Sequence, residues 1–304
     1  MTNKWLKVAL MVTAIATGTS IKIDAETVLY VPQDDRPVSL QYTVDTAREA
    51  GMTVLTPPQH LISGKTYQGQ ADQIMAWVEQ NAGRADVMVL STDTLIYGGL
   101  VDSRKHNIPL STLQNRLKRI EGLKARNKNV RIYGFGTVMR SPRASGGGTE
   151  PAYYAEYGPT IFQIAALQDK LDSGSLTQEE TQKLMSLQAS VPVEYLQDWF
   201  DRRQKNMKIN KELIDETRSG VFDYFALGHD DTSQLSQSAL EGRYLNKYSK
   251  DISVEKYGSF PGADQLGLLL MARSRTDVST EKPTFSVIYP LGGGGKTLPG
   301  YEDR

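Results

Sequence analysis

Residues 86–100 read DVMVLSTDTLIYGGL, in which a short apolar run passes directly into a polar and glycine-rich segment. The same succession occurs at 27–37, where TVLYV precedes PQDDRP, and at 224–233, where YFALG precedes HDDTS. Near-continuous apolar runs of this length are typical of strands buried on both faces of a parallel sheet. Ligands bind at the carboxyl ends of such strands. The three segments therefore predict a polar, carboxylate-rich site in an α/β protein.

Amphipathic segments alternate with apolar runs along most of the chain. Apolar residues recur at helical spacing at 43–50, 71–80 and 111–125, which predicts helices there. Strands are predicted at 28–31, 53–56, 87–91, 130–134, 221–227 and 284–289. This alternation predicts an α/β fold with a mainly parallel, doubly wound sheet, and a (β/α) barrel-like arrangement is the alternative.

A long stretch interrupts the alternation after the fourth apolar run. Residues 138–158 have the composition of a loop, and residues 160–218 are polar and helical in pattern. Within the helical stretch, Thr177 and Glu180 have the spacing of a capping box, which marks the start of a helix. We expect residues from about 160 to 218 to form a helical insertion in one α/β domain over 26–304.

The N-terminal segment has the composition of a secretory signal peptide. Lys4 and Lys7 flank the start of an apolar stretch at 8–17, and Ala25 provides a small residue at a cleavage position. The apolar stretch is too short for a comfortable membrane span. We therefore predict a signal peptide over 1–25, a secreted or extracytoplasmic protein, and no membrane span after cleavage.

Composition argues against several function classes. The 304 residues include 35 Lys and Arg and 35 Asp and Glu, so the formal net charge is zero. A general nucleic-acid binder needs a basic excess to contact phosphates, so nucleic acid is not expected as a partner. The absence of cysteine excludes disulfides, thiol nucleophiles and Cys-ligated zinc. Three histidines are too few to favour a zinc site built from several of them.

Charged and polar side chains follow several predicted strands, and we expect them to meet at the carboxyl edge of the sheet. Carboxylates there could exchange protons, and arginines could bind anionic groups or tune the carboxylates. Turns, helix caps and ion pairs are the competing structural interpretation of the same residues. The candidate residues are Asp34, Asp35, Arg36, Asp93, Tyr97, Arg104, Arg140, Asn206, Asp230 and Asp231.

Five segments resemble a bacterial conserved-domain family of unknown function. They are VPQDDRPVS (31–39), VLSTDTLIYGGLVDSR (89–104), RRQKNMKIN (202–210), LGHDDTSQ (227–234) and GADQLGLLLMAR (262–273). The resemblance implies that the candidate residues other than Asn206 belong to one shared site. Members of that family are longer, so we expect that a C-terminal portion is missing here. His229 and Gln265 stand where a glutamine and a glutamate are expected in the family, which weakens a catalytic role for His229.

The candidate residues favour an exported hydrolase acting on a carbohydrate, and we predict a glycosidase. That chemistry needs two carboxyl groups flanking the bond, one as acid and the other as base or nucleophile. Asp93 with Asp230 or Asp231 is the predicted pair, and the remaining candidates would bind a saccharide or another polar small molecule. Tyr97 and the tyrosines at 153–157 would stack on sugar rings. No metal ligand or cofactor is assigned.

Two other functions stay open at this point. A non-catalytic exported protein could use the same polar groups to bind a polar ligand. A metal-dependent hydrolase of phosphate or acyl esters would use oxygen ligands around a divalent cation. The ligands of that cation would be Asp34, Asp35, Asp230 and His229.

Overall fold

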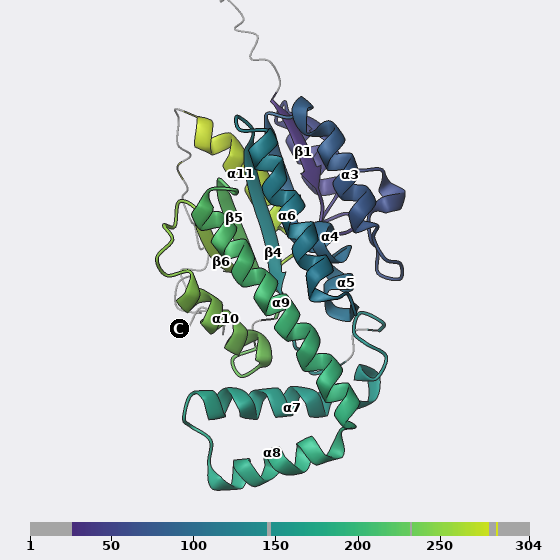
Figure 1. The fold of residues 1–304 in the computed structure, drawn as a ribbon, viewed down its shortest axis with the longest axis vertical. Helices are drawn as coiled ribbons and strands as arrows, with labels where there is room; N and C mark the ends of the chain where they lie inside the picture. The colour runs from purple at the N-terminus through teal and green to yellow at the C-terminus, as the bar shows by residue number, and fades with distance from the viewer. Residues whose placement is uncertain (1–25, 145–146, 232, 280–283, 285–304) are drawn as a thin grey trace, which may run out of the picture.

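A parallel sheet forms the centre of the computed structural model, which describes residues 26–144, 147–231, 233–279 and 284 (Figure 1). Its order is β2-β1-β3-β4-β5-β6, and every neighbouring pair is parallel. The strands are β1 (Thr27–Val31), β2 (Thr53–Leu55), β3 (Val87–Ser91), β4 (Arg131–Val138), β5 (Tyr224–His229) and β6 (Tyr257–Pro261).

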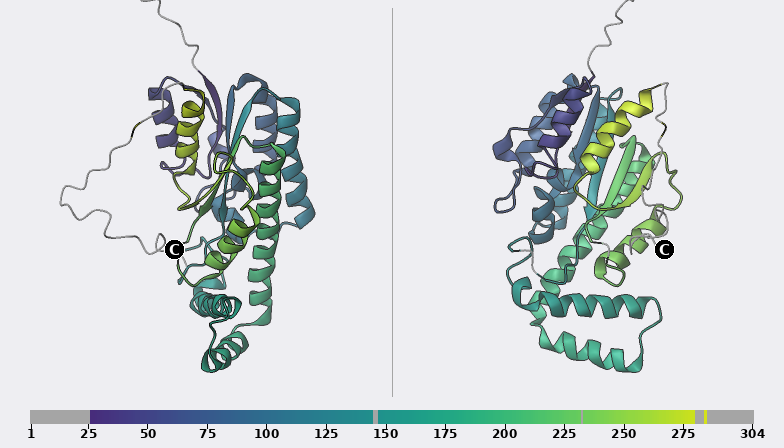
Figure 2. Two further views of the ribbon diagram at one scale, coloured as in Figure 1. Left: turned by 90° about the vertical axis from the view of Figure 1, so that its left-hand side faces the viewer. Right: turned by 180° about the vertical axis from the view of Figure 1, so that it is seen from behind.

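Helices cover both faces of the sheet. α3, α6, α9 and α10 share one hydrophobic core with the sheet, and α2 and α11 share the other. Figure 2 shows α11 and α9 on opposite sides of the strands. The helices are α2 (Gln41–Glu49), α3 (Ala71–Asn81), α4 (Thr92–Tyr97), α5 (Leu100–Lys105), α6 (Leu110–Arg126), α7 (Tyr154–Asp172), α8 (Gln178–Ser190), α9 (Val193–Ser219), α10 (Gln237–Tyr248) and α11 (Leu266–Val278). Two short 3₁₀ turns, η1 (Gln59–Leu61) and η2 (Ala82–Arg84), complete the described elements.

The two cores explain why the strands are apolar at successive positions. In β1, Leu29 and Val31 belong to the core with α3 and α6, whereas Val28 and Tyr30 belong to the core with α2 and α11. Successive side chains of a strand point to opposite faces. A strand covered on both faces must therefore be apolar throughout, as the sequence pattern predicted.

The sheet is open, with β2 and β6 at its edges, so the described residues form a doubly wound sheet rather than a barrel. The first connection leads from β1 to β2 on one side, and the chain then returns to place β3 on the other side of β1. Strand order therefore reverses between β1 and β3. Ligands of open α/β sheets bind at such a switch point, outside the carboxyl ends of the strands.

The helices α7 and α8 lie beyond the carboxyl ends of the strands (Figure 1). With the first part of α9 they enclose a separate small core that contains Tyr154 and Trp199. The predicted capping box is confirmed, because Thr177 accepts from the Glu180 amide and Glu180 accepts from the Thr177 amide. These helices occupy most of the stretch predicted as helical over 160–218, although α7 begins earlier.

The strands predicted at 28–31, 53–56, 87–91, 130–134 and 221–227 correspond to β1 to β5, with ends that differ by up to four residues. The helices expected at 43–50, 71–80 and 111–125 are α2, α3 and α6. The sequence analysis did not indicate α4, α5, α10 or β6. The helices α4 and α5 have only six residues each, α10 is rich in polar residues, and β6 is a partly exposed edge strand that contains glycine and proline. The predicted signal peptide, the C-terminal expectation and the strand predicted at 284–289, apart from its first residue, lie outside the described residues.

The described part of the chain contains no candidate for a membrane-spanning helix. None of the helices there combines the length and the apolar character that a bilayer span requires.

Candidate functional site

Asp93 lies at the carboxyl end of β3, in the first turn of α4. Ser91 caps this helix by accepting a hydrogen bond from the Thr94 amide at 3.3 Å, which fixes the turn after the strand. Oδ2 of Asp93 accepts hydrogen bonds from Thr137 Oγ1 at 2.7 Å and from Gln33 Nε2 at 3.2 Å. Thr137 belongs to β4 and Gln33 follows β1, so three neighbouring strands converge on one carboxyl group.

The environment of Asp93 changes its acidity. Its side chain is 2 % exposed, and burial raises its pKa to about 6. The hydrogen bonds from Thr137 and Gln33 lower this pKa, and the charge of Asp230 raises it. A carboxyl group with this pKa can hold or release a proton between mildly acidic and neutral pH. The influence of Asp230 means that carboxyl groups from the third and fifth strands are close enough to interact.

Asp230 is ion-paired with a buried arginine. Arg104 Nη2, from α5, contacts Asp230 Oδ2, and the two side chains are 4 % and 14 % exposed. Burial lowers the pKa of Arg104, the charge of Asp230 opposes this effect, and the charge of Arg140 lowers it further. Arg104 Nε is buried and has no hydrogen-bond partner among the described residues. The pair therefore has an unused donor at the centre of the candidate site.

Two glycines bring α5, and with it Arg104, against the end of the sheet. Gly98 ends α4 in the left-handed conformation, with φ at +114°, which favours glycine. A Cβ on Gly99 would lie 1.8 Å from Ser63 Oγ, so the chain passes this point only because the residue has no side chain. The YGGL sequence thus has a structural role in placing Arg104.

Arg36 joins the loop after β1 to the start of α11. Its Nε contacts Asp34 Oδ2 at 2.8 Å, and its Nη2 contacts Asp264 Oδ1 at 2.7 Å. Asp34 is buried, whereas Asp264 is exposed. Asp35 turns away from this pair and accepts a hydrogen bond from the Tyr67 hydroxyl. Of the two adjacent aspartates, Asp34 is therefore the one that belongs to the Arg36 network.

A polar pocket of about 360 Å³ lies at the ends of β5 and β6. Asp230, Asp264 and Gln265 provide its polar side chains, and residues 261–263 provide much of its backbone. Carboxylate groups accept hydrogen bonds from hydroxyl groups, and an amide group can both accept and donate them. The pocket is therefore suited to a small, hydroxyl-rich ligand, with Asp230 between it and Arg104.

A family model described as "Protein of unknown function (DUF4127)" matches residues 28–304. The chain belongs to this family. A comparison with curated proteins gives no match. Membership confirms the resemblance to a conserved-domain family of unknown function, and the matched range includes every candidate residue named above. The description of the DUF4127 family assigns no activity to its members.

Arg140 is held by its own loop. Its Nε donates to Glu150 Oε1 at 2.7 Å, and its Nη2 donates to Thr149 Oγ1 at 2.7 Å. The Glu150 side chain is buried, and the Arg140 side chain is 24 % exposed. Arg140 can therefore act on the site through its charge beside Arg104, while its guanidinium stays paired with Glu150.

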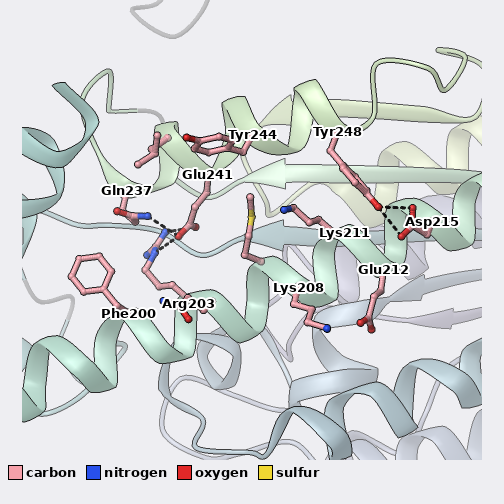
Figure 3. A pocket seen from close by; sticks show the side chains of 13 residues that line it. Phe200, Arg203, Lys208, Lys211, Glu212, Asp215, Gln237, Glu241, Tyr244 and Tyr248 are labelled. Atoms are coloured by element: carbon pink, nitrogen blue, oxygen red, sulfur yellow. Dashed lines mark hydrogen bonds and ion pairs between the residues drawn. The ribbon is translucent and has the colours of Figure 1, made fainter. Parts of the chain in front are cut away.

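Helix α9 fixes the backbone that carries Arg140. Arg203 Nη1 donates to the Arg140 carbonyl at 3.0 Å, and Arg203 Nε pairs with Glu241 Oε1 at 2.7 Å. Figure 3 shows this pair in a cavity of about 620 Å³ between α9 and α10. At the other side of the cavity, the Tyr248 hydroxyl donates to Asp215 Oδ2 at 2.9 Å. Arg203 therefore supports the loop after β4 from the side of α9, whereas Tyr248 and Asp215 join α10 to α9.

Asp231 and Asn206 are occupied by protein groups. The two carboxyl oxygens of Asp231 accept from the amides of Ser141, at 3.2 Å, and Ser233, at 3.0 Å. Asn206 Oδ1 contacts His106 Nε2 at 2.7 Å, and Asn206 Nδ2 donates to a backbone carbonyl of α5 at 2.8 Å. Asp231 therefore ties the loops after β4 and β5 together, and Asn206 ties α9 to α5. The catalytic and substrate-binding roles predicted for them stay predictions.

The tyrosines that were predicted to stack on sugar rings pack against other residues of the protein. Tyr154 is fully buried against Trp199, so the expectation that it stacks on a sugar ring is wrong. The other two tyrosines of that segment pack on α9. Tyr97 stacks on His106, with ring centroids 4.9 Å apart, and its buried hydroxyl has no partner among the described residues. Burial, followed by the charge of Asp93, raises the pKa of Tyr97.

Two residues that the sequence did not single out, Gln33 and Thr137, join the site together with Asp264. Gln33 and Thr137 donate to Asp93, and Asp264 pairs with Arg36. Gln33 could have been found, because it stands inside the polar burst PQDDRP. Thr137 gave no signal, since it lies within an apolar strand, and Asp264 resembles an ordinary helix cap.

The carboxylates of the candidate site bear on whether it could hold a metal ion. The described ranges contain no group of three or more His, Asp or Glu side chains arranged to hold a metal ion. Asp34 and Asp230 are each paired with an arginine, Arg36 and Arg104 respectively. A divalent cation bound by these carboxylates would have to displace the arginines.

Proposed function

We propose that this protein is an exported glycosidase that uses Asp93 and Asp230 as its two carboxyl groups. The observation that carries the proposal is the environment of Asp93, a buried carboxyl group with a pKa of about 6 that senses the charge of Asp230. Glycosidases need one carboxyl group as an acid and a second as a base or nucleophile. Carboxyl groups in such different environments are suited to different roles.

Asp93 is assigned the role of general acid. Its protonated carboxyl group would donate to the glycosidic oxygen while the bond to the anomeric carbon breaks. Thr137 and Gln33 would then stabilise the carboxylate that remains, because both donate to Oδ2. Asp230, paired with Arg104, takes the role of base or nucleophile. It is preferred to Asp231, whose oxygens accept backbone amides.

The substrate class follows from the pocket beside Asp230. Asp264 and Gln265 line it with Asp230, and its volume of about 360 Å³ suits one or two sugar units. Arg36 holds Asp264 from the side of β1. These groups would recognise hydroxyls by hydrogen bonding, without the aromatic stacking expected from the sequence.

The test is hydrolysis of a panel of 4-nitrophenyl glycosides and of soluble polysaccharides, each with and without EDTA. We expect metal-independent turnover, with Asp93→Asn and Asp230→Asn each reducing it by about 10²- to 10⁴-fold. Asp45→Asn is the matched control, because Asp45 is exposed on α2. Its turnover should equal that of the wild type.

Three outcomes would overturn the proposal. Turnover that survives in both Asp93→Asn and Asp230→Asn would place the chemistry elsewhere. Activity that EDTA abolishes and Mn²⁺ restores would favour the metal-dependent ester hydrolase. Stabilisation of the protein by a saccharide without any turnover would favour a non-catalytic binding protein.

A further inference from the structure

A second polar pocket, of about 230 Å³, lies between α10 and the ends of β5 and β6. Pro261 is the one lining residue that it shares with the pocket beside Asp230. Its polar side chains are His229, Asp231, Ser233, Arg243, Asn246 and Ser259. None of these has a role in the proposed glycosidase reaction.

His229 and Ser259 form a direct hydrogen bond in this pocket. His229 Nε2 and Ser259 Oγ are 2.7 Å apart. The strand register explains the contact: Leu227 is the partner of Ser259 across β5 and β6, and His229 lies two residues beyond Leu227 on the same face. Both side chains line the pocket and are partly exposed, so a small molecule can reach them.

Gly242 of α10 leaves room for the imidazole ring of His229. A Cβ on Gly242 would lie 2.5 Å from His229 Cε1 and 3.0 Å from Nδ1. The ring therefore occupies space that any other residue at 242 would fill. A serine hydroxyl within 2.6–3.2 Å of a positioned base is the arrangement that activates a nucleophile.

We propose that Ser259 and His229 form a second catalytic site, which hydrolyses esters of short carboxylic acids such as acetyl esters. Ser259 Oγ attacks the acyl carbon while its proton passes to His229 Nε2. The ester C–O bond then breaks, and the leaving alkoxide takes that proton and departs as the alcohol.

Water completes the reaction. It attacks the acyl-serine and gives a proton to His229 Nε2, and the bond between Oγ and the acyl group breaks to release the carboxylic acid. The proton returns from Nε2 to Ser259 Oγ. Arg243 and Asn246 line the same pocket; both terminal nitrogens of Arg243 are paired with Asp169, so the amide of Asn246 is the donor proposed for the oxyanion of both steps. The volume limits the acyl group to a short chain.

The experiment uses a fluorophosphonate probe, followed by intact-mass analysis and peptide mapping. The hydroxyl of Ser259 attacks phosphorus, fluoride leaves, and His229 takes the proton, so we expect one adduct per chain at Ser259. Ser259→Ala should abolish the adduct, and His229→Asn should slow its formation by about 100-fold or more. Ser233→Ala is the matched control, because Ser233 lines the same pocket and should keep the wild-type labelling rate.

Hydrolysis of 4-nitrophenyl acetate provides a second readout. Turnover should fall in parallel with labelling in Ser259→Ala and His229→Asn, while melting temperatures confirm that both variants fold. The proposal is overturned by no adduct on the folded wild-type protein, by an adduct at another residue, or by equal labelling of His229→Asn. Asp93→Asn should label normally, so failure here is distinguishable from failure of the glycosidase proposal.

Discussion

Replacing Asp93 by Asn should make the protein more stable at neutral pH. The pKa of this carboxyl group is about 6 in the folded protein, against 3.8 for an ordinary Asp, and burial is the main cause. The difference of about two pH units corresponds to about 3 kcal/mol of unfolding free energy. Asn is neutral and its Oδ1 can accept the same hydrogen bonds. The variant would therefore not lose this unfolding free energy at neutral pH.

The direction of this pH dependence is set by whether the folded or the unfolded state holds the proton. Below pH 3.8 the carboxyl group is protonated in both states, and the folded state keeps the proton up to about pH 6. The protonated Asp93 carboxyl group therefore makes its full contribution to the unfolding free energy below pH 3.8. This contribution is lost as pH rises to about 6. The wild type and Asp93→Asn should have similar stability near pH 4. At pH 7 the variant should be more stable by about 3 kcal/mol.

Urea unfolding of both proteins at intervals from pH 4 to 8 measures the effect, because the difference between them isolates the titration of Asp93. Asp45→Asn, on the exposed side of α2, is the control and should follow the wild type at every pH. A difference that stays constant within about 0.5 kcal/mol across this range would refute the reasoning. So would a variant that is less stable than the wild type at pH 7.

The other predictions concern the elements that hold the site. Arg104→Met should lower the unfolding free energy by about 3–5 kcal/mol in urea at pH 7, because it leaves Asp230 charged and mostly buried; a loss below about 1 kcal/mol contradicts this. Gly99→Ala should cost about 1–3 kcal/mol, since its Cβ would lie 1.8 Å from a serine hydroxyl. Gly83→Ala, with open space around it, is the control, and equal melting temperatures would count against the clash. Thr177→Ala should cost about 1 kcal/mol and speed hydrogen exchange in α8, because it removes the capping box; unchanged exchange would contradict the role of the cap.

Local sequence could predict an element when each of its faces is consistently buried or consistently exposed. β1 and β3 are buried on both faces, so their apolar runs mark them directly. Helices such as α6 show helical spacing because one face packs on the sheet. The edge strand β6 escaped prediction because exposure lets it contain glycine, serine and proline. Its position became visible only through its pairing with β5.

The candidate site was predictable as a region but not as a set of contacts. Polar bursts after apolar runs placed Asp93 and Asp230 at the same edge of the sheet, because parallel strands end together. They could not separate Asp230, which pairs with Arg104, from its neighbour Asp231, which accepts backbone amides. Adjacent residues in a sequence look alike, whereas the folded chain gives them different partners.

The sequence by itself determined the alternation of strands and helices, the carboxyl edge as the place for polar groups, and the family resemblance. Tertiary structure alone decided which groups meet. Arg36 reaches Asp264 across 228 positions, and Thr137 reaches Asp93 across 44. The acidity of Asp93 was likewise decided by folding, because a raised carboxyl pKa comes from burial and from charges brought near it. Burial and proximity are properties of the assembled chain, which is why no local pattern could supply them.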